Sequence, residues 1–139
     1  MLRLVLAAEQ EPISLDDAKL HLRVDGDEED LLLSGFIASA REVVERQTGY
    51  ALAIATYEWD TPSAAERLPI EPAVAISQPG VMPVRFRTDP GPAPQALRAA
   101  ILLLVADLYA NREAGITGTI HVVNPTVDRL VFPYRRLTP

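Results

Sequence analysis

The chain has 139 residues, 48% of them hydrophobic, which suits a single folded domain with a hydrophobic core of its own. It contains no cysteine, so disulfides, thiolate metal sites and cysteine nucleophiles are excluded. The formal net charge is −6 at pH 7, and most of the acidic side chains lie in the first third of the chain. An excess of negative charge repels the phosphates of nucleic acid, so the composition argues against a protein that binds nucleic acid tightly.

The chain begins with a short apolar run at residues 4–8. This run is shorter than the hydrophobic region of a signal peptide, and acidic residues follow it directly. We therefore expect an N-terminal strand or arm.

Two helices are predicted next, over residues 14–24 and 28–48. Ser14 is a good N-cap for the first helix, because its hydroxyl can accept a hydrogen bond from the first turn. Gly49 supplies a left-handed cap at the end of the second. The two helices form a hairpin with a tight acidic turn between them.

The second helix combines an apolar stripe with charged residues. Leu33, Ile37 and Val44 recur at helical spacing and predict the buried face. Arg41 and Glu45 are four residues apart, and we expect them to form an ion pair on the solvent side.

The acidic turn at residues 25–30 reads DGDEED and resembles the start of a calcium loop. A calcium-binding loop of the EF-hand type closes with a glutamate at its twelfth position, where this chain has Phe36. We interpret the turn instead as the start of the second helix, with Asp27 as its N-cap and acidic residues at the positive helix end. A metal-dependent enzyme that uses this turn is the weakest of the alternatives.

The middle of the chain is rich in proline, with eight of the twelve prolines between Pro62 and Pro94. A strand is predicted over residues 53–60, followed by short extended runs at 66–70, 74–77 and 84–87. Prolines keep such runs short. We expect a small β-hairpin or meander, inserted at about residues 53–88.

A long helix follows over residues 95–113, and every residue from 99 to 106 is apolar. This apolar run is much shorter than a bilayer span, which needs about 20 apolar residues. We therefore interpret the helix as the central helix of the domain, covered on most of its circumference. The end of the chain, about residues 126–139, is predicted to form one further turn and then an extended tail. The fold class is therefore mainly α, a small helical bundle around the long helix with a proline-rich β insertion.

The residue types that carry common enzyme chemistry are scarce. The chain has two histidines, His21 and His121, and no glycine-rich phosphate loop or nucleophile motif. We predict no catalytic, cofactor-binding or metal-binding residues and no cofactor. The sequence favours a protein that works by binding.

Three stretches together have a specific order and spacing. The first is ISLDDAKLHLRVDGDEEDLLLSGFIASAREVVERQTGYAL. It matches a pattern at Leu15, Lys19, residues 22–25, Asp30, Ala40, Arg41, Glu45, Thr48 and Gly49. The second, PQALRAAILLLVADLYANRE, ends in Tyr109, Arg112 and Glu113, and the third is VDRLVFPYRR. They resemble the head–tail connector (adaptor) family of tailed phages, prophages and gene transfer agents, with the proline-rich middle left uncovered.

The resemblance implies a non-enzymatic protein of the virion, located at the head–tail junction and in the bacterial cytoplasm during assembly. It implies a homo-oligomeric ring, usually of twelve copies, beneath the portal protein. Such a ring extends the DNA channel, lets DNA pass without sequence-specific binding, and joins the head to a stopper or tail-completion protein. It implies no contact with a membrane.

Three groups of residues are candidates for these contacts. The tail residues Phe132, Pro133, Tyr134, Arg135 and Arg136 are expected to bind the portal or a neighbouring ring. The end of the long helix, Tyr109, Arg112 and Glu113, is a candidate subunit interface. The acidic turn, Asp25, Asp27, Glu28, Glu29 and Asp30, is a candidate for the channel wall, where negative charge lets DNA slide without sticking.

The residues leave two alternatives open. The tail either binds a partner or is folded onto its own domain. The chain is either a connector subunit or a small self-contained interaction or regulatory domain, monomeric or dimeric.

Overall fold

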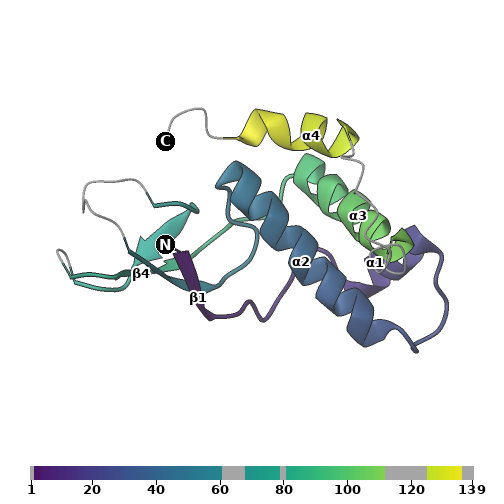
Figure 1. The fold of residues 1–139 in the computed structure, drawn as a ribbon, viewed down its shortest axis with the longest axis horizontal. Helices are drawn as coiled ribbons and strands as arrows, with labels where there is room; N and C mark the ends of the chain where they lie inside the picture. The colour runs from purple at the N-terminus through teal and green to yellow at the C-terminus, as the bar shows by residue number, and fades with distance from the viewer. Residues whose placement is uncertain (1, 61–67, 79–80, 112–124, 136–139) are drawn as a thin grey trace.

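The computed structural model describes residues 2–60, 68–78, 81–111 and 125–135. In these ranges four helices occupy one end of the long axis and a four-stranded sheet occupies the other (Figure 1). The elements in chain order are β1 (Leu2–Leu6), α1 (Leu15–Leu22), α2 (Asp30–Thr48), β2 (Thr56–Trp59), β3 (Ala73–Ala75), β4 (Val84–Thr88), α3 (Gln95–Ala110), α4 (Pro125–Val131) and the short 3-10 helix η2 (Phe132–Tyr134).

The sheet is antiparallel throughout, with the strand order β1-β2-β4-β3. Its inner face carries a row across the strands in which Tyr57 lies opposite Leu4 on one side and Phe86 on the other. The rings of Tyr57 and Phe86 are stacked, with their centroids 5.5 Å apart. These two rings, with Ala51, Ala55 and Ile70, form a core that is separate from the core of the helices.

The predicted fold class is confirmed in part, because the protein is mainly helical but its sheet is larger than an insertion. We expected a mainly helical protein with a β insertion, but the N-terminal strand β1 pairs with β2, across the whole α1–α2 hairpin in sequence, and completes a four-stranded sheet. The expectation of an N-terminal strand is confirmed, while the fold is mixed α/β. Of the predicted run 66–70, only residues 68–70 are described, and they form no strand.

The helices pack around α3, which is the central helix as predicted. Its residues Leu97, Ala100, Ile101 and Val105 are fully buried against α2, α1 and α4. The covering is less complete at Leu102, Leu103 and Leu104, which are half-buried but still pack against this core. The helix ends at Ala110, and the predicted last residues 112 and 113 lie outside the described ranges.

Of the two predicted helix N-caps in the α1–α2 hairpin, one is confirmed and one is wrong. Ser14 accepts a hydrogen bond from the Asp17 N–H at 3.0 Å, as expected of an N-cap. The predicted cap at Asp27 is wrong: α2 begins at Asp30 with Glu29 at the N-cap position and no side-chain cap. Asp27 instead forms an ion pair across the turn with Lys19 on α1, because their opposite charges attract.

The further helical turn predicted near the end of the chain is confirmed by α4, whereas the extended tail predicted after it is wrong for residues 132–134. Residues 125–134 form α4 and η2. Pro125 suits the first turn of a helix, where its missing N–H costs no hydrogen bond. Val127 and Val131, four residues apart, place one apolar side on the core, and both are buried.

Gly49 ends α2 in the left-handed conformation, with φ 71°, and its N–H donates to the Glu45 carbonyl at 2.7 Å. Gly49→Ala is expected to lower the free energy of unfolding by about 1–2 kcal/mol, because an added Cβ is strained in this conformation. Gly35→Ala is the matched control. Gly35 lies inside the same helix, and an added Cβ there would have no neighbouring atom within 4 Å, so that variant is expected to be more stable by ~0.5–1 kcal/mol. Urea denaturation measures both, and equal effects of the two substitutions would contradict the expectation.

Candidate partner-binding surfaces

A buried ion-pair network joins the helices to the sheet. Arg41 donates from Nε to Glu11 at 2.5 Å and from Nη1 to Glu45 at 2.6 Å, and only 3% of Arg41 and 1% of Glu45 are exposed. The second oxygen of Glu45 accepts the Leu52 N–H at 2.8 Å. The prediction that Arg41 and Glu45 lie on the solvent side is therefore wrong: they fix the segment that leads from α2 to the sheet.

Thr88 holds the same segment from the sheet side. Its hydroxyl accepts the Ala55 N–H at 2.8 Å and donates to the Ala53 carbonyl at 2.6 Å. Thr88 is fully buried at the end of β4. The connection over residues 51–55 is thus anchored at both ends by buried side chains, so the sheet has a fixed position on the helices.

The charges of the network affect the pKa values of its members. Burial raises the pKa of Glu45, while the Leu52 N–H and Arg41 act in the opposite direction. For Arg41, burial alone would lower the pKa, but the hydrogen bond with Glu11 and the charge of Glu45 outweigh it and the pKa is raised.

The raised pKa of Glu45 predicts a pH dependence of stability. A carboxyl whose pKa is higher in the folded than in the unfolded chain contributes stability that is full below the unfolded value and is lost as pH rises through the folded value. The stability of the wild type relative to Glu45→Gln is therefore expected to fall as pH rises from about 4.5, the ordinary value. Urea denaturation of both proteins from about pH 4 to 8 measures it, and a difference that rises with pH would contradict it.

The C-terminal segment divides its aromatic residues between the core and the surface. Tyr134 is half-buried and meets Tyr50 edge to face, with ring centroids 5.7 Å apart and planes at 80°. Phe132 is 61% exposed, and Pro133 and Arg135 are exposed as well. Of the predicted binding residues, Tyr134 thus holds the segment on its own domain, three face outward, and Arg136 lies outside the described residues.

The end of α3 is tied to the acidic turn. The Tyr109 hydroxyl donates to Glu29 Oε1 at 2.8 Å, across 80 residues of sequence. This bond gives Tyr109 a role within the chain. Arg112 and Glu113, predicted with it as a subunit interface, lie outside the described residues.

The acidic turn has an inner and an outer set of carboxyl groups. Lys19 forms ion pairs with Asp30 and with Asp27, the latter at 3.0 Å. The hydrogen bond with Asp30, followed by that with Asp27, raises the pKa of Lys19. Asp30 and Glu29 are half-buried, whereas Asp25, Asp27 and Glu28 are exposed. Among the described residues no group of three His, Cys, Asp or Glu side chains is placed to hold a metal ion.

The outer face of the sheet is a further charged surface, which the sequence did not reveal. Strand register places Arg3, Glu58 and Arg85 side by side, and both arginines form ion pairs with Glu58. The hydrogen bond from Arg85, followed by that from Arg3, lowers the pKa of Glu58. Arg87 lies exposed on the same face, two residues along β4. The pairing register of three strands brings these residues together. The alternation of residues along one short strand does not reveal which residues of other strands lie beside it.

A groove of about 780 Å³ runs beside this face, between the sheet and the start of α3. Its wall includes the exposed side chains of Leu6 and Ile54, with Arg87 and Arg98 among its charged residues.

In the part of the chain that the structure describes, no helix is long and apolar enough to cross a bilayer.

Comparisons with known proteins agree with this picture of a binding protein. Residues 12–135 match the family described as phage gp6-like head-tail connector protein. Two solved structures have the same fold over 100% of this chain and 97% of theirs, at 18% sequence identity. One is the neck of an empty gene transfer agent particle, computed with C6 symmetry (TM-score 0.71), and the other is the virion of a native gene transfer agent particle (TM-score 0.70). A search of curated proteins found no match.

The family match covers most of the chain and includes α1, α2, α3 and α4 with the sheet strands β2, β3 and β4. It also contains the three stretches whose order and spacing carried the resemblance, except for the last residue of the third, Arg136. This protein therefore belongs to the phage gp6-like head–tail connector family and is a structural connector of phage-like particles, not an enzyme.

Proposed function

We propose that this protein forms a ring of identical subunits in the neck of a phage-like virion, between the portal and the stopper or tail-completion protein. The family match over residues 12–135 is the observation that carries the proposal. The likeness of its fold to chains of a gene transfer agent neck, computed there with C6 symmetry, supports it. Twelve copies, the usual number in the family, would be compatible with such symmetry. DNA passes through the ring without sequence-specific binding.

In this ring the C-terminal segment docks on the portal. Phe132, Pro133 and Arg135 are exposed on a segment that is itself anchored by Val131 and Tyr134. An exposed aromatic side chain beside an arginine is the pattern of an interface anchor. Because Val131 is part of the core, deleting the whole segment would damage the fold, and point substitutions are the better test.

Phe132→Ala combined with Arg135→Ala is expected to reduce the docking of the connector on DNA-filled heads at least tenfold, because about 2 kcal/mol or more is typical of an anchor residue. The assay adds purified variant to heads that lack the connector and counts tailed particles by electron microscopy.

Arg129→Ala is the matched control, since Arg129 is an exposed arginine on α4, one to two turns before the docking residues. All three proteins should show the same melting temperature. Normal tail attachment by the Phe132 and Arg135 variant would exclude this segment as the docking surface. A wild-type chain that never enters particles would exclude the connector ring itself.

A further inference from the structure

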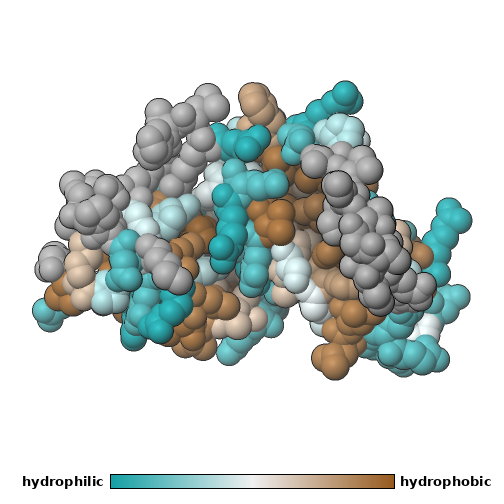
Figure 2. Space-filling view, in the orientation of Figure 1, coloured by the Kyte–Doolittle hydropathy of each residue, from teal (hydrophilic) through white to brown (hydrophobic). Residues whose placement is uncertain are grey.

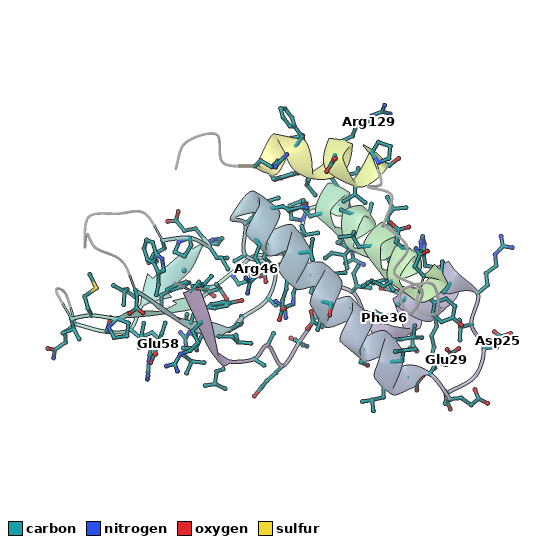
Figure 3. All side chains as sticks on the ribbon, viewed as in Figure 1. Asp25, Glu29, Phe36, Arg46, Glu58 and Arg129 are labelled. Carbon is teal, nitrogen blue, oxygen red and sulfur yellow. The ribbon has the colours of Figure 1, made fainter. Side chains whose placement is uncertain are left out.

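Each end of the long axis carries one charged surface, acidic at one end and basic at the other, and both expose hydrophobic side chains. Figure 3 shows Asp25 and Glu29 at one end and Glu58, on the sheet, at the other. Figure 2 shows hydrophobic residues at the surface near both ends. One end is acidic at the turn between α1 and α2, and the other carries the arginines of the sheet.

The first of these surfaces, the acidic end, consists of Leu20, Asp25, Asp27, Glu28 and Leu31. Leu20 is 80% exposed and Leu31 90% exposed, the two highest values among the large hydrophobic side chains of the described residues. They flank the turn in sequence, one on the last turn of α1 and one on the first turn of α2. Leucines this exposed beside carboxylates have the composition of a docking surface, with an apolar contact and a charged rim.

The second surface, the basic sheet face, consists of Arg3, Arg85, Arg87, Val74 and Ile76. Register places Val74 beside Arg87, and the Ile76 N–H donates to the Arg85 carbonyl at 2.8 Å. Val74 is 53% exposed and Ile76 54% exposed. Glu58 and, just beyond β2, Asp60 are the acidic residues beside these three arginines, so three positive charges against two negative ones leave this face positive by one.

We propose that the acidic end of one copy binds the basic sheet face of the next copy around the ring. The two surfaces are complementary in charge, yet they lie at opposite ends of one rigid chain and cannot meet within it (Figure 1). A second copy, placed head to tail, brings them together. Repeating such a contact with a constant rotation closes a ring, whereas a two-fold dimer through either surface would oppose like charges.

This inference rests on the proposed ring and names its subunit contact. It also assigns the exposed carboxylates Asp25, Asp27 and Glu28 to a neighbouring subunit, in place of the channel wall expected from the sequence. Because the rim charges are solvent-exposed, the contact weakens with salt, as the screening length shortens to about 8 Å at 0.15 M.

Cross-linking in assembled particles tests the contact directly, because the chain contains no cysteine of its own. A variant carrying both Glu28→Cys and Arg87→Cys is expressed in place of the wild type, and purified particles are treated with a short thiol-reactive cross-linker. Both positions are exposed, so the substitutions leave the core intact. The expected result is a ladder of covalent oligomers that extends to the complete ring on a denaturing gel.

The matched control combines Glu28→Cys with Arg129→Cys, which pairs the acidic end with an exposed position on α4. It is expected to give no ladder. A ladder from the control and none from the Glu28 and Arg87 pair would overturn the proposal. Dimers from Glu28→Cys alone would also overturn it, since they place two acidic ends together. If the chain were absent from particles, the ring itself would be wrong, so the two failures are distinguishable.

Charge exchange gives an independent test. Glu28→Lys alone and Arg87→Glu alone are each expected to lower the yield of tailed particles at least tenfold, with melting temperatures unchanged. Co-expression of the two variants is expected to restore the yield, because alternating copies then meet only opposite charges in a ring with an even number of subunits. Failure of the mixture to restore assembly would count against the contact.

Discussion

Arg41→Ala is expected to lower the free energy of unfolding by about 3–5 kcal/mol, among the largest effects of any single substitution in this chain. The variant leaves Glu45 without its ion-pair partner at 1% exposure, and it also frees Glu11 from its bond to α2. The cost is mainly that of an uncompensated buried charge. Urea denaturation, followed by the fluorescence of the single tryptophan, Trp59, measures it at neutral pH.

A matched control lies next to Arg41. Glu42→Ala removes a charged side chain from the adjacent, half-buried position on α2 and is expected to change stability by no more than about 0.5 kcal/mol. A second comparison replaces the pair, Arg41→Met with Glu45→Leu, and is expected to recover much of the loss, because no buried charge remains. If Arg41→Ala were as mild as Glu42→Ala, the network would not hold the sheet to the helices.

Phe86→Ala is expected to lower the free energy of unfolding by about 3–5 kcal/mol. Phe86 has no exposed surface, lies at the centre of the sheet between β2 and β3, and stacks on Tyr57. The core of the sheet is small, so its neighbours have little freedom to fill the cavity.

Phe132→Ala is the control for this substitution, because it removes the same side chain from a position that is 61% exposed. Its effect on stability is expected to stay within about 0.5 kcal/mol. Phe86→Leu tests the volume argument and should lie between the two. A small effect of Phe86→Ala would mean that the sheet adds little to the stability of the whole chain.

The sequence predicts best where a local pattern decides the structure. The apolar stripe of α2, the Ser14 cap and the Gly49 cap each depend on a few neighbouring residues, and the structure confirms all three. The order of the helices follows from them. The sheet needed pairings between segments more than 50 residues apart, such as Leu4 with Tyr57, which no local pattern contains.

Arg41 and Glu45 show why charge alone misplaces a residue. A charged i,i+4 pair is normally assigned to solvent, yet these residues adjoin the buried positions Ile37, Val44 and Thr48 on one side of the helix. Their burial depends on partners from elsewhere, Glu11 before α1 and the Leu52 N–H after α2. The helical position was visible in the sequence, but the partners were not.

The candidate binding residues were identified as groups and then divided by the fold. Among the described tail residues, Tyr134 packs on Tyr50 while Phe132 remains outside, although both looked alike as aromatic residues beside arginine. Lys19 similarly takes Asp27 and Asp30 into its own ion pairs. Composition cannot predict which members of each group are taken up within the chain, because this depends on which side of a short helix faces the core.

The alternation of anchored and exposed residues at the end of the chain has a consequence for binding. Val131 is buried and Tyr134 is held by Tyr50, so the residues between them, Phe132 and Pro133, are ordered before any partner arrives. A flexible tail would lose about 1–2 kcal/mol of backbone entropy for every residue that it orders on binding. In the docking on the portal proposed above, folding has already supplied that order, so more of the contact energy would be retained as affinity and the complex would dissociate more slowly.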